Sequence, residues 1–168
     1  NFVKRLKARQ SLEDRLGIVE KIAPLGWHVV IYTEPEDMEE IQPFLESVDV
    51  PVIFDHMGRV PVEKGIDCPE FERLERLLTS SDRFWVKVSC PERLTKQGPP
   101  HHDADAVSKR LIEIVPDRVL FGTDWPHPNM KSHIPDDGLL VARIERICPD
   151  EGLRHKLLVD NPTRLYWD

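Results

Sequence analysis

The stretch that decides the fold is a strand that runs into a carboxylate: Arg118-Val119-Leu120-Phe121-Gly122-Thr123-Asp124-Trp125-Pro126-His127. Its apolar centre carries β-branched and aromatic side chains, which predicts a buried strand. The prolines that follow predict a loop. An unbroken apolar strand is buried on both faces, as in a parallel sheet that helices cover.

Three similar strands precede this one, and amphipathic stretches separate them. The predicted strands are His28–Thr33, Pro51–His56, Phe84–Ser89 and Arg118–Asp124, with a stub at Phe2-Val3-Lys4. The predicted helices are Ser11–Ala23, Pro35–Ser47, Pro69–Ser80 and Asp103–Ile114, the last capped by Asp103, and helical segments continue from about Asp137 without a further strand. This order predicts an α/β fold with parallel strands, either a doubly wound sheet or a (β/α)8 barrel. Four strands make about half of a barrel.

Composition excludes several classes of protein. The 168 residues are 40% hydrophobic and 32% charged, which is typical of one globular domain. A net charge of -7 argues against nucleic-acid binding, and no run of roughly 18 apolar residues predicts a membrane span. Three widely spaced cysteines, Cys68, Cys90 and Cys148, predict neither a disulfide framework nor a cysteine zinc site, so we expect a cytoplasmic protein.

The N-terminus begins Asn1-Phe2-Val3, without an initiator methionine or a signal peptide. We therefore expect the chain to be preceded by the N-terminal half of the barrel. No linker interrupts residues 1–168, which are expected to form the C-terminal half of a single domain.

Asp124 is the first candidate for chemistry. The carboxyl ends of barrel strands form the active-site face, so an aspartate there is a candidate general base or metal ligand. It would equally serve as the cap of the following turn, and spacing alone leaves both interpretations open.

His56 and Arg93 follow two other strands. His56 would exchange a proton, bind a metal or polarise a carbonyl, although a histidine beside Asp55 is often only structural. Arg93 has the planar guanidinium that recognises carboxylates, or it lies in solvent or pairs with Glu92. Cys90 is expected to be a small buried residue and not a nucleophile, because no histidine–asparagine pattern accompanies it.

Three motifs occur at the predicted strand ends: Asp55-His56-Met57-Gly58, Lys87-Val88-Ser89-Cys90-Pro91-Glu92-Arg93-Leu94 and Gly122-Thr123-Asp124-Trp125-Pro126-His127-Pro128-Asn129. Together they resemble the 2-pyrone-4,6-dicarboxylate hydrolases of the amidohydrolase superfamily. The resemblance implies a distorted (β/α)8 TIM barrel, of which this chain covers about strands 5–8. It implies that Asp124 activates water and that His56 helps to polarise a lactone carbonyl. It assigns substrate binding to Arg93, Arg5 and Tyr32.

The reaction implied by the resemblance is hydrolysis of the lactone 2-pyrone-4,6-dicarboxylate to an open-chain oxo-tricarboxylate in the breakdown of lignin-derived aromatic compounds. The family's His-x-His pair occurs nowhere in the sequence. The resemblance implies that no metal is required. A metal-dependent decarboxylase, with zinc or manganese at His56 and Asp124, stays open as an alternative, as do a non-catalytic assembly module and a homo-oligomer.

Overall fold

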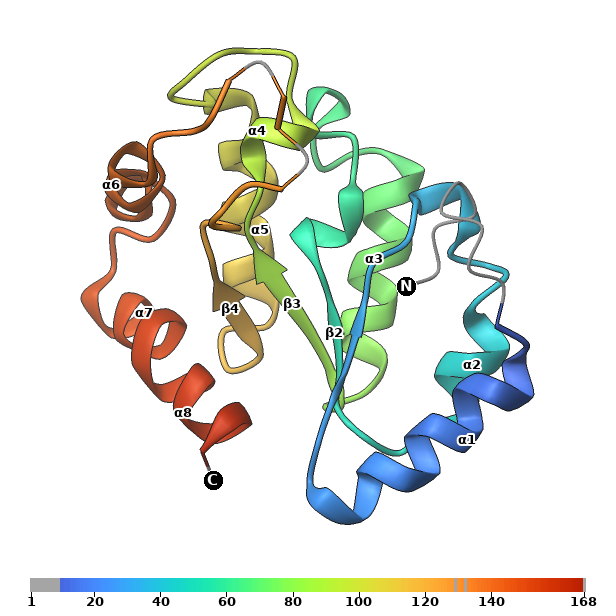
Figure 1. The fold of residues 1–168 in the computed structure, drawn as a ribbon. Coiled ribbons are helices and arrows are strands. Elements are labelled where there is room, and N and C mark those ends of the chain that lie inside the picture. The colour runs from blue at the N-terminus through green and yellow to red at the C-terminus, as the bar shows by residue number, and fades with distance from the viewer. Residues whose placement is uncertain (1–9, 129, 132, 168) are drawn as a thin grey trace.

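The computed structural model describes residues 10–128, 130–131 and 133–167, and within them four parallel strands lie side by side in chain order. They are β1 (Val29–Ile31), β2 (Val52–Phe54), β3 (Phe84–Val88) and β4 (Val119–Phe121) (Figure 1). The predicted parallel α/β arrangement is confirmed. Each strand is shorter than predicted, because the chain turns before the polar residues at its carboxyl end. The predicted stub at 2–4 lies outside the described residues.

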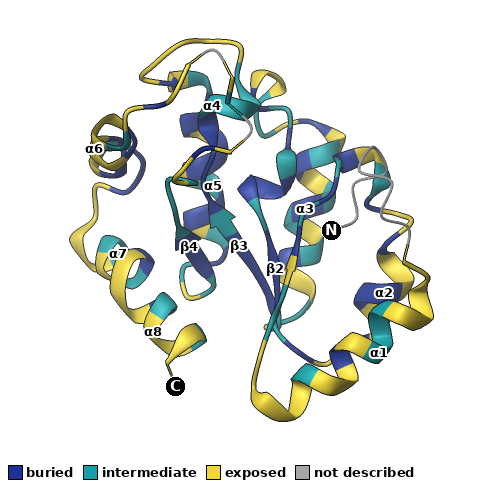
Figure 2. Cartoon of the chain, in the orientation of Figure 1, coloured by how far each residue is buried: buried dark blue, intermediate teal, exposed yellow. Residues whose placement is uncertain are grey.

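The two faces of the sheet are covered unequally. Strand residues such as Val52, Phe54 and Val86 pack with the helices in the main core. Residues of opposite parity form a second, smaller cluster of Ile53, Trp85 and Leu120. In Figure 2 the strands are mostly buried, and exposed residues lie mainly on the outer helices. The helix-covered face is therefore the larger core.

Two predicted helices are confirmed almost to the residue. The first, α1 (Leu12–Ile22), begins after Ser11, whose hydroxyl accepts a hydrogen bond from the Asp14 backbone N–H at 3.0 Å. The Asp14 carboxylate accepts one from the Ser11 backbone N–H, so the two residues form a capping box. The second, α3 (Pro69–Ser80), opens on a proline, which the first turn of a helix tolerates.

Two predicted helices needed correction. The stretch 35–47 is a 3-10 turn at Pro35–Asp37 followed by the short helix α2 (Gln42–Ser47). Pro43 has no N–H to donate and fits only the first turn of α2, which prevents one continuous helix. The helix predicted from Asp103 begins as α5 (Asp105–Ile114) after a 3-10 turn at His102–Ala104. Asp103 does not cap it, because its carboxylate accepts a hydrogen bond from Thr95.

The helical C-terminal part of the chain is confirmed for the described residues. It comprises α6 (Asp137–Ile147), α7 (Glu151–His155), a π-helical turn (Lys156–Asp160) and α8 (Asn161–Tyr166). The short helix α4 (Pro91–Leu94) follows β3, and 3-10 turns occupy Ala23–Leu25, His56–Arg59 and Val62–Lys64. None of the helices in the described ranges has the length and apolarity needed to cross a bilayer.

Candidate active site

The parallel sheet brings polar residues from three strands to one edge. β2 runs into His56, β3 into Ser89 and Cys90, and β4 into Asp124. The arrowheads of β2 and β3 point toward the end of the molecule where α4 lies (Figure 1). The sequence had suggested that His56 and Asp124 are the last residues of two strands, but both lie beyond the strands. They nevertheless meet where the carboxyl ends of a barrel-type sheet hold an active site.

The backbone is strained just after β2, β3 and β4. His56, Cys90 and Asp124 have φ angles of 50°, 56° and 70°, in the left-handed region. Each such non-glycine residue costs about 1–2 kcal/mol, so the surrounding structure must enforce it. Three strained positions at one edge of the sheet mark this region as a candidate functional site.

Arg93 joins the three strand ends. Its Nη2 lies 2.8 Å from His56 Nε2 and 2.8 Å from Asp124 Oδ2. The same nitrogen lies 2.9 Å from Cys90 Sγ. The side chain is only 11% exposed, and its carboxylate partner is Asp124, so it is not a solvated loop arginine. The structure thus brings together His56, Arg93 and Asp124.

The contacts of His56 fix its tautomer. A guanidinium only donates hydrogen bonds, so His56 Nε2 accepts from Arg93 and the proton resides on Nδ1. Nδ1 then donates to Ser89 Oγ at 2.8 Å. Burial lowers the pKa of His56, the nearby Asp55 and Asp124 carboxylates oppose this change, and Arg93 and Lys87 reinforce it. His56 is therefore a neutral imidazole in the folded protein at neutral pH.

Asp55 and Lys87 form a charge pair beside His56. Lys87 Nζ lies 3.0 Å from Asp55 Oδ1, and Asp55 Oδ2 lies 3.4 Å from His56 Nε2. Sequence reasoning had given no role to Lys87. The signal was available, because Lys87 alternates with the buried Val86 and Val88 in β3 and so faces the opposite side of the sheet.

Tyr32 borders the same site from the end of β1. Its ring meets the ring of His56 edge-on, with 5.6 Å between centroids. Arg59 donates a hydrogen bond from Nη1 to the Tyr32 hydroxyl at 2.9 Å and pairs with Glu34 at 2.7 Å. Arg59 was missed because nothing in the sequence relates it to Tyr32, 27 residues earlier. Arg5 lies outside the described residues.

Three side chains of the site carry atoms that could ligate a metal ion. Donor atoms of His56, Cys90 and Asp124 lie within 4.8 Å of one another. The Arg93 guanidinium lies within 2.9 Å of an atom of each, so a fixed cation already stands among these donors. The three residues do not fit a divalent ion in this arrangement. Burial raises the pKa of Cys90 strongly, so its thiol stays protonated and is neither a nucleophile nor a good ligand.

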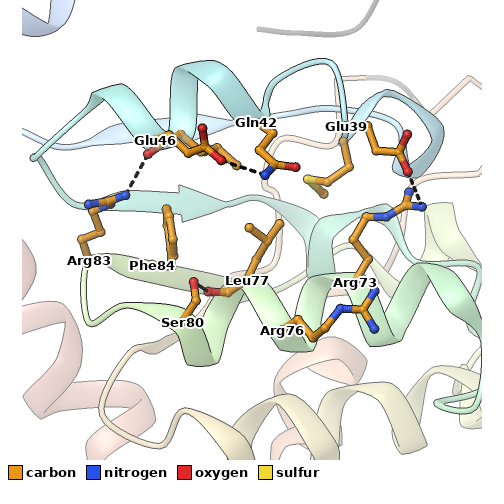
Figure 3. A pocket seen from close by; sticks show the side chains of 11 residues that line it. Glu39, Gln42, Glu46, Arg73, Arg76, Leu77, Ser80, Arg83 and Phe84 are labelled. Atoms are coloured by element: carbon orange, nitrogen blue, oxygen red, sulfur yellow. Dashed lines mark hydrogen bonds and ion pairs between the residues drawn. The ribbon is translucent and has the colours of Figure 1, made fainter.

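A groove on the outer side of the molecule lies between α2 and α3 (Figure 3). Its arginines are engaged by the chain itself: Arg73 pairs with Glu39 at 2.9 Å, and Arg83 donates to the Leu45 carbonyl at 2.9 Å. None of the residues that line it belongs to the strand-end site. The groove is therefore separate from the candidate chemistry.

Comparison with known proteins identifies the family of this chain. The amidohydrolase family model matches residues 2–167. The chain is 48% identical to a 2-pyrone-4,6-dicarboxylate hydrolase of Comamonas testosteroni, over 99% of this chain and 57% of that protein. It is 38% identical to a 4-sulfomuconolactone hydrolase of Rhizobium radiobacter, over 84% of this chain and 48% of that protein.

A solved structure is also similar, that of a probable 2-pyrone-4,6-dicarboxylic acid hydrolase from Acinetobacter baumannii with citric acid bound. The TM-score is 0.75 at 26% identity, over 93% of this chain and 59% of that one. The chain spans about half the length of the curated relatives it matches. With a family model that matches nearly every residue, the chain belongs to the amidohydrolase family.

Proposed function

We propose that this chain is part of a lactone hydrolase that opens 2-pyrone-4,6-dicarboxylate to an open-chain oxo-tricarboxylate. The observation that carries the proposal is the contact of Arg93 with both His56 and Asp124 at the strand ends. This contact gathers a carboxylate, a neutral imidazole and a cation, which supports a reaction on one small molecule. The name of the relative that is 48% identical supports the choice of substrate.

The reaction divides among these groups as follows. Asp124 takes a proton from water, and the oxygen of that water attacks the lactone carbonyl carbon. Arg93 favours the negative charge that develops on the carbonyl oxygen, and His56, whose Nε2 accepts a hydrogen bond from Arg93, orients that guanidinium. The ring C–O bond then breaks, and the proton held by Asp124 passes to the leaving enol oxygen. The enol becomes the oxo group of the product.

Substrate recognition follows from charge. A dicarboxylate lactone needs cations placed at fixed positions, and a guanidinium binds a carboxylate through paired hydrogen bonds. We assign this role to Arg93 and to Arg5, which lies outside the described residues. Tyr32, which borders the site, would also contact the substrate. The citric acid bound to the Acinetobacter baumannii relative supports a site for polycarboxylates.

The proposed fold is a distorted (β/α)8 barrel in which β1 to β4 are strands 5–8. Residues 1–168 would then be the C-terminal half of one barrel domain, with the other half upstream, in a cytoplasmic enzyme. The partly uncovered sheet face supports this, because Val30 of β1 is 40% exposed where the remaining strands of a barrel would cover it.

We propose that the reaction needs no metal, because Arg93 supplies positive charge among the donors that would otherwise hold one. The test is ultraviolet absorbance of 2-pyrone-4,6-dicarboxylate with the full-length gene product after chelator treatment. We expect turnover to survive chelation and to fall by about 10²- to 10⁴-fold in Asp124→Asn, which lacks the base.

The matched control is Asp117→Asn, which makes the same change at an exposed ion pair with Lys156 and should keep parental turnover. Loss of turnover on chelation, with recovery on adding zinc or manganese, would favour the metal-dependent alternative at His56 and Asp124. No turnover by the intact protein would reject the substrate.

A further inference from the structure

A second buried polar cluster lies next to Asp124, and the proposed reaction does not use it. Glu92 comes from α4, His127 from the turn after β4, and Asp137 from the first turn of α6. His127 Nδ1 lies 3.6 Å from Glu92 Oε1, and its Nε2 lies 3.3 Å from Asp137 Oδ1. The side chains of His127 and Glu92 are only 1% and 2% exposed. The imidazole thus lies between the buried Glu92 carboxylate and the carboxylate of Asp137, whose side chain is 40% exposed.

Burial of this cluster is energetically unfavourable. Both Glu92 oxygens, both His127 ring nitrogens and Asp137 Oδ1 have no hydrogen-bond partner among the described residues. A buried polar group without such a partner costs about 1–3 kcal/mol, and an apolar residue there would avoid the cost. Buried polar groups of this kind call for a functional explanation.

The turn that carries Asp124 supplies that explanation. The His127 backbone N–H donates to the Asp124 carbonyl at 2.7 Å and closes the turn. Both residues have left-handed backbones, with φ of 70° at Asp124 and 56° at His127. A strained turn keeps its conformation only when contacts with the rest of the protein enforce it. The side chain of His127 is buried and supplies such contacts.

The helix α4 meets this turn at two consecutive residues. Arg93 contacts the Asp124 carboxylate at 2.8 Å, and its neighbour Glu92 faces the imidazole of His127 at 3.6 Å. Two contacts between the same pair of segments fix orientation as well as distance, whereas one contact leaves a hinge. The Glu92–His127 contact is the second of these two contacts between α4 and the turn.

We propose that Glu92 and His127 are positioning residues that hold the Asp124 carboxylate in place for the reaction. This positioning role in catalysis rests on the proposed lactone hydrolysis. The predicted dependence of the Arg93–Asp124 contact on Glu92 does not. A divalent cation is the other occupant to consider, because donor atoms of Glu92, Asp124 and His127 lie within 4.8 Å of one another. Arg93 on Asp124 disfavours it, since a fixed guanidinium repels an ion at the same carboxylate.

The test compares Glu92→Gln with a matched control, Glu145→Gln, which makes the same change at an exposed position of α6. In Glu92→Gln we expect kcat to fall by about 10- to 100-fold with KM within about twofold, because a displaced base slows chemistry without weakening binding. The control should match the parent. A purely structural role would instead lower the unfolding midpoint and leave the kcat of the folded enzyme unchanged, which would overturn the proposal.

Crystal structures of the parent and of Glu92→Gln test the positioning role without a substrate. The contact between Arg93 Nη2 and Asp124 Oδ2 should persist in the parent and lengthen in the variant. An unchanged contact would overturn the positioning role even if the lactone is turned over. If the parent does not open the lactone but the contact is lost in the variant, the proposed function is rejected and the positioning role is kept. Zinc binding by the parent that Glu92→Gln abolishes would make the cluster a cation site and overturn the proposal.

Discussion

At the scale of the residue, His56 shows how burial sets a protonation state. Its side chain is 7% exposed, and burial lowers its pKa below the ordinary value of 6.5. The unfolded chain therefore binds the His56 proton more readily than the folded protein does. The contribution of His56 to stability is fully present above about pH 6.5 and is lost as the pH falls through and below that value.

We expect the free energy of unfolding to decrease between about pH 7.5 and about pH 5.5, and to decrease less in His56→Gln. Denaturant unfolding at each pH measures both slopes. The pKa of His28 is also lowered, but His28 is present in both proteins, so the difference belongs to His56. Equal slopes in the two proteins would contradict the assignment.

At the same scale, residue types and motifs predicted which polar residues gather after the strands. Asp124, His56 and Arg93 were all expected at strand ends, and the structure brings them into contact. Arg59 was not expected, because its partner Tyr32 lies 27 residues away in the sequence. Lys87 was overlooked, although its alternation with Val86 and Val88 set it on the other face of the sheet. The roles assigned to the site residues stay predictions.

At the scale of the element, an ion-pair cluster joins two helices that succeed each other around the sheet. Asp105 opens α5, and its carboxylate accepts hydrogen bonds from Arg143 and Arg146 of α6. Arg143 is 2% exposed and also donates to the Ala104 carbonyl at 2.9 Å. These contacts lower the pKa of Asp105 although burial acts to raise it. The Asp105 carboxylate therefore supplies the negative charge that compensates for the burial of Arg143.

Asp105→Asn leaves the buried Arg143 without its counter-charge, so we expect a loss of about 3–5 kcal/mol in the free energy of unfolding. Denaturant titration at neutral pH measures the loss. Asp117→Asn removes an exposed partner of Lys156 and should change stability by about 1 kcal/mol or less. Similar losses in the two variants would show that burial of the cluster contributes nothing.

Element prediction was most accurate where one periodic pattern spans the whole element. Helix α3 matched its prediction at both ends, because its apolar residues recur at helical spacing and Pro69 marks its start. The stretch 35–47 failed because Pro43 interrupts a pattern that otherwise reads as helical. Helix α5 begins later than predicted, because the Asp103 carboxylate accepts a hydrogen bond from Thr95 and does not cap the helix.

At the scale of the whole molecule, the sheet presents one well-covered face and one thinly covered face. On the thin face Ile53, Trp85 and Leu120 are buried with Leu165, while Val30 on the outermost described strand is 40% exposed. An apolar side chain on an edge strand favours association with another chain.

We therefore expect the 168-residue chain, expressed by itself, to self-associate as its concentration rises. Val30→Lys should shift it toward the monomer, because a charge on an edge strand opposes pairing. Light scattering across a concentration series measures both. Val141→Lys makes the same change on exposed α6, where Val141 is 50% exposed, and should not affect association. A monomer at every concentration would contradict the expectation.

The sequence by itself determined the four strands, their parallel order, the helices α1 and α3, and the strand ends at which polar residues gather. It could do so because periodicity and turn residues act over a few neighbouring positions. Only the tertiary structure decided that Arg93 stands between His56 and Asp124, and that His127 lies between Glu92 and Asp137. Such contacts join residues on different elements, and their distances depend on how strands, turns and helices pack in three dimensions.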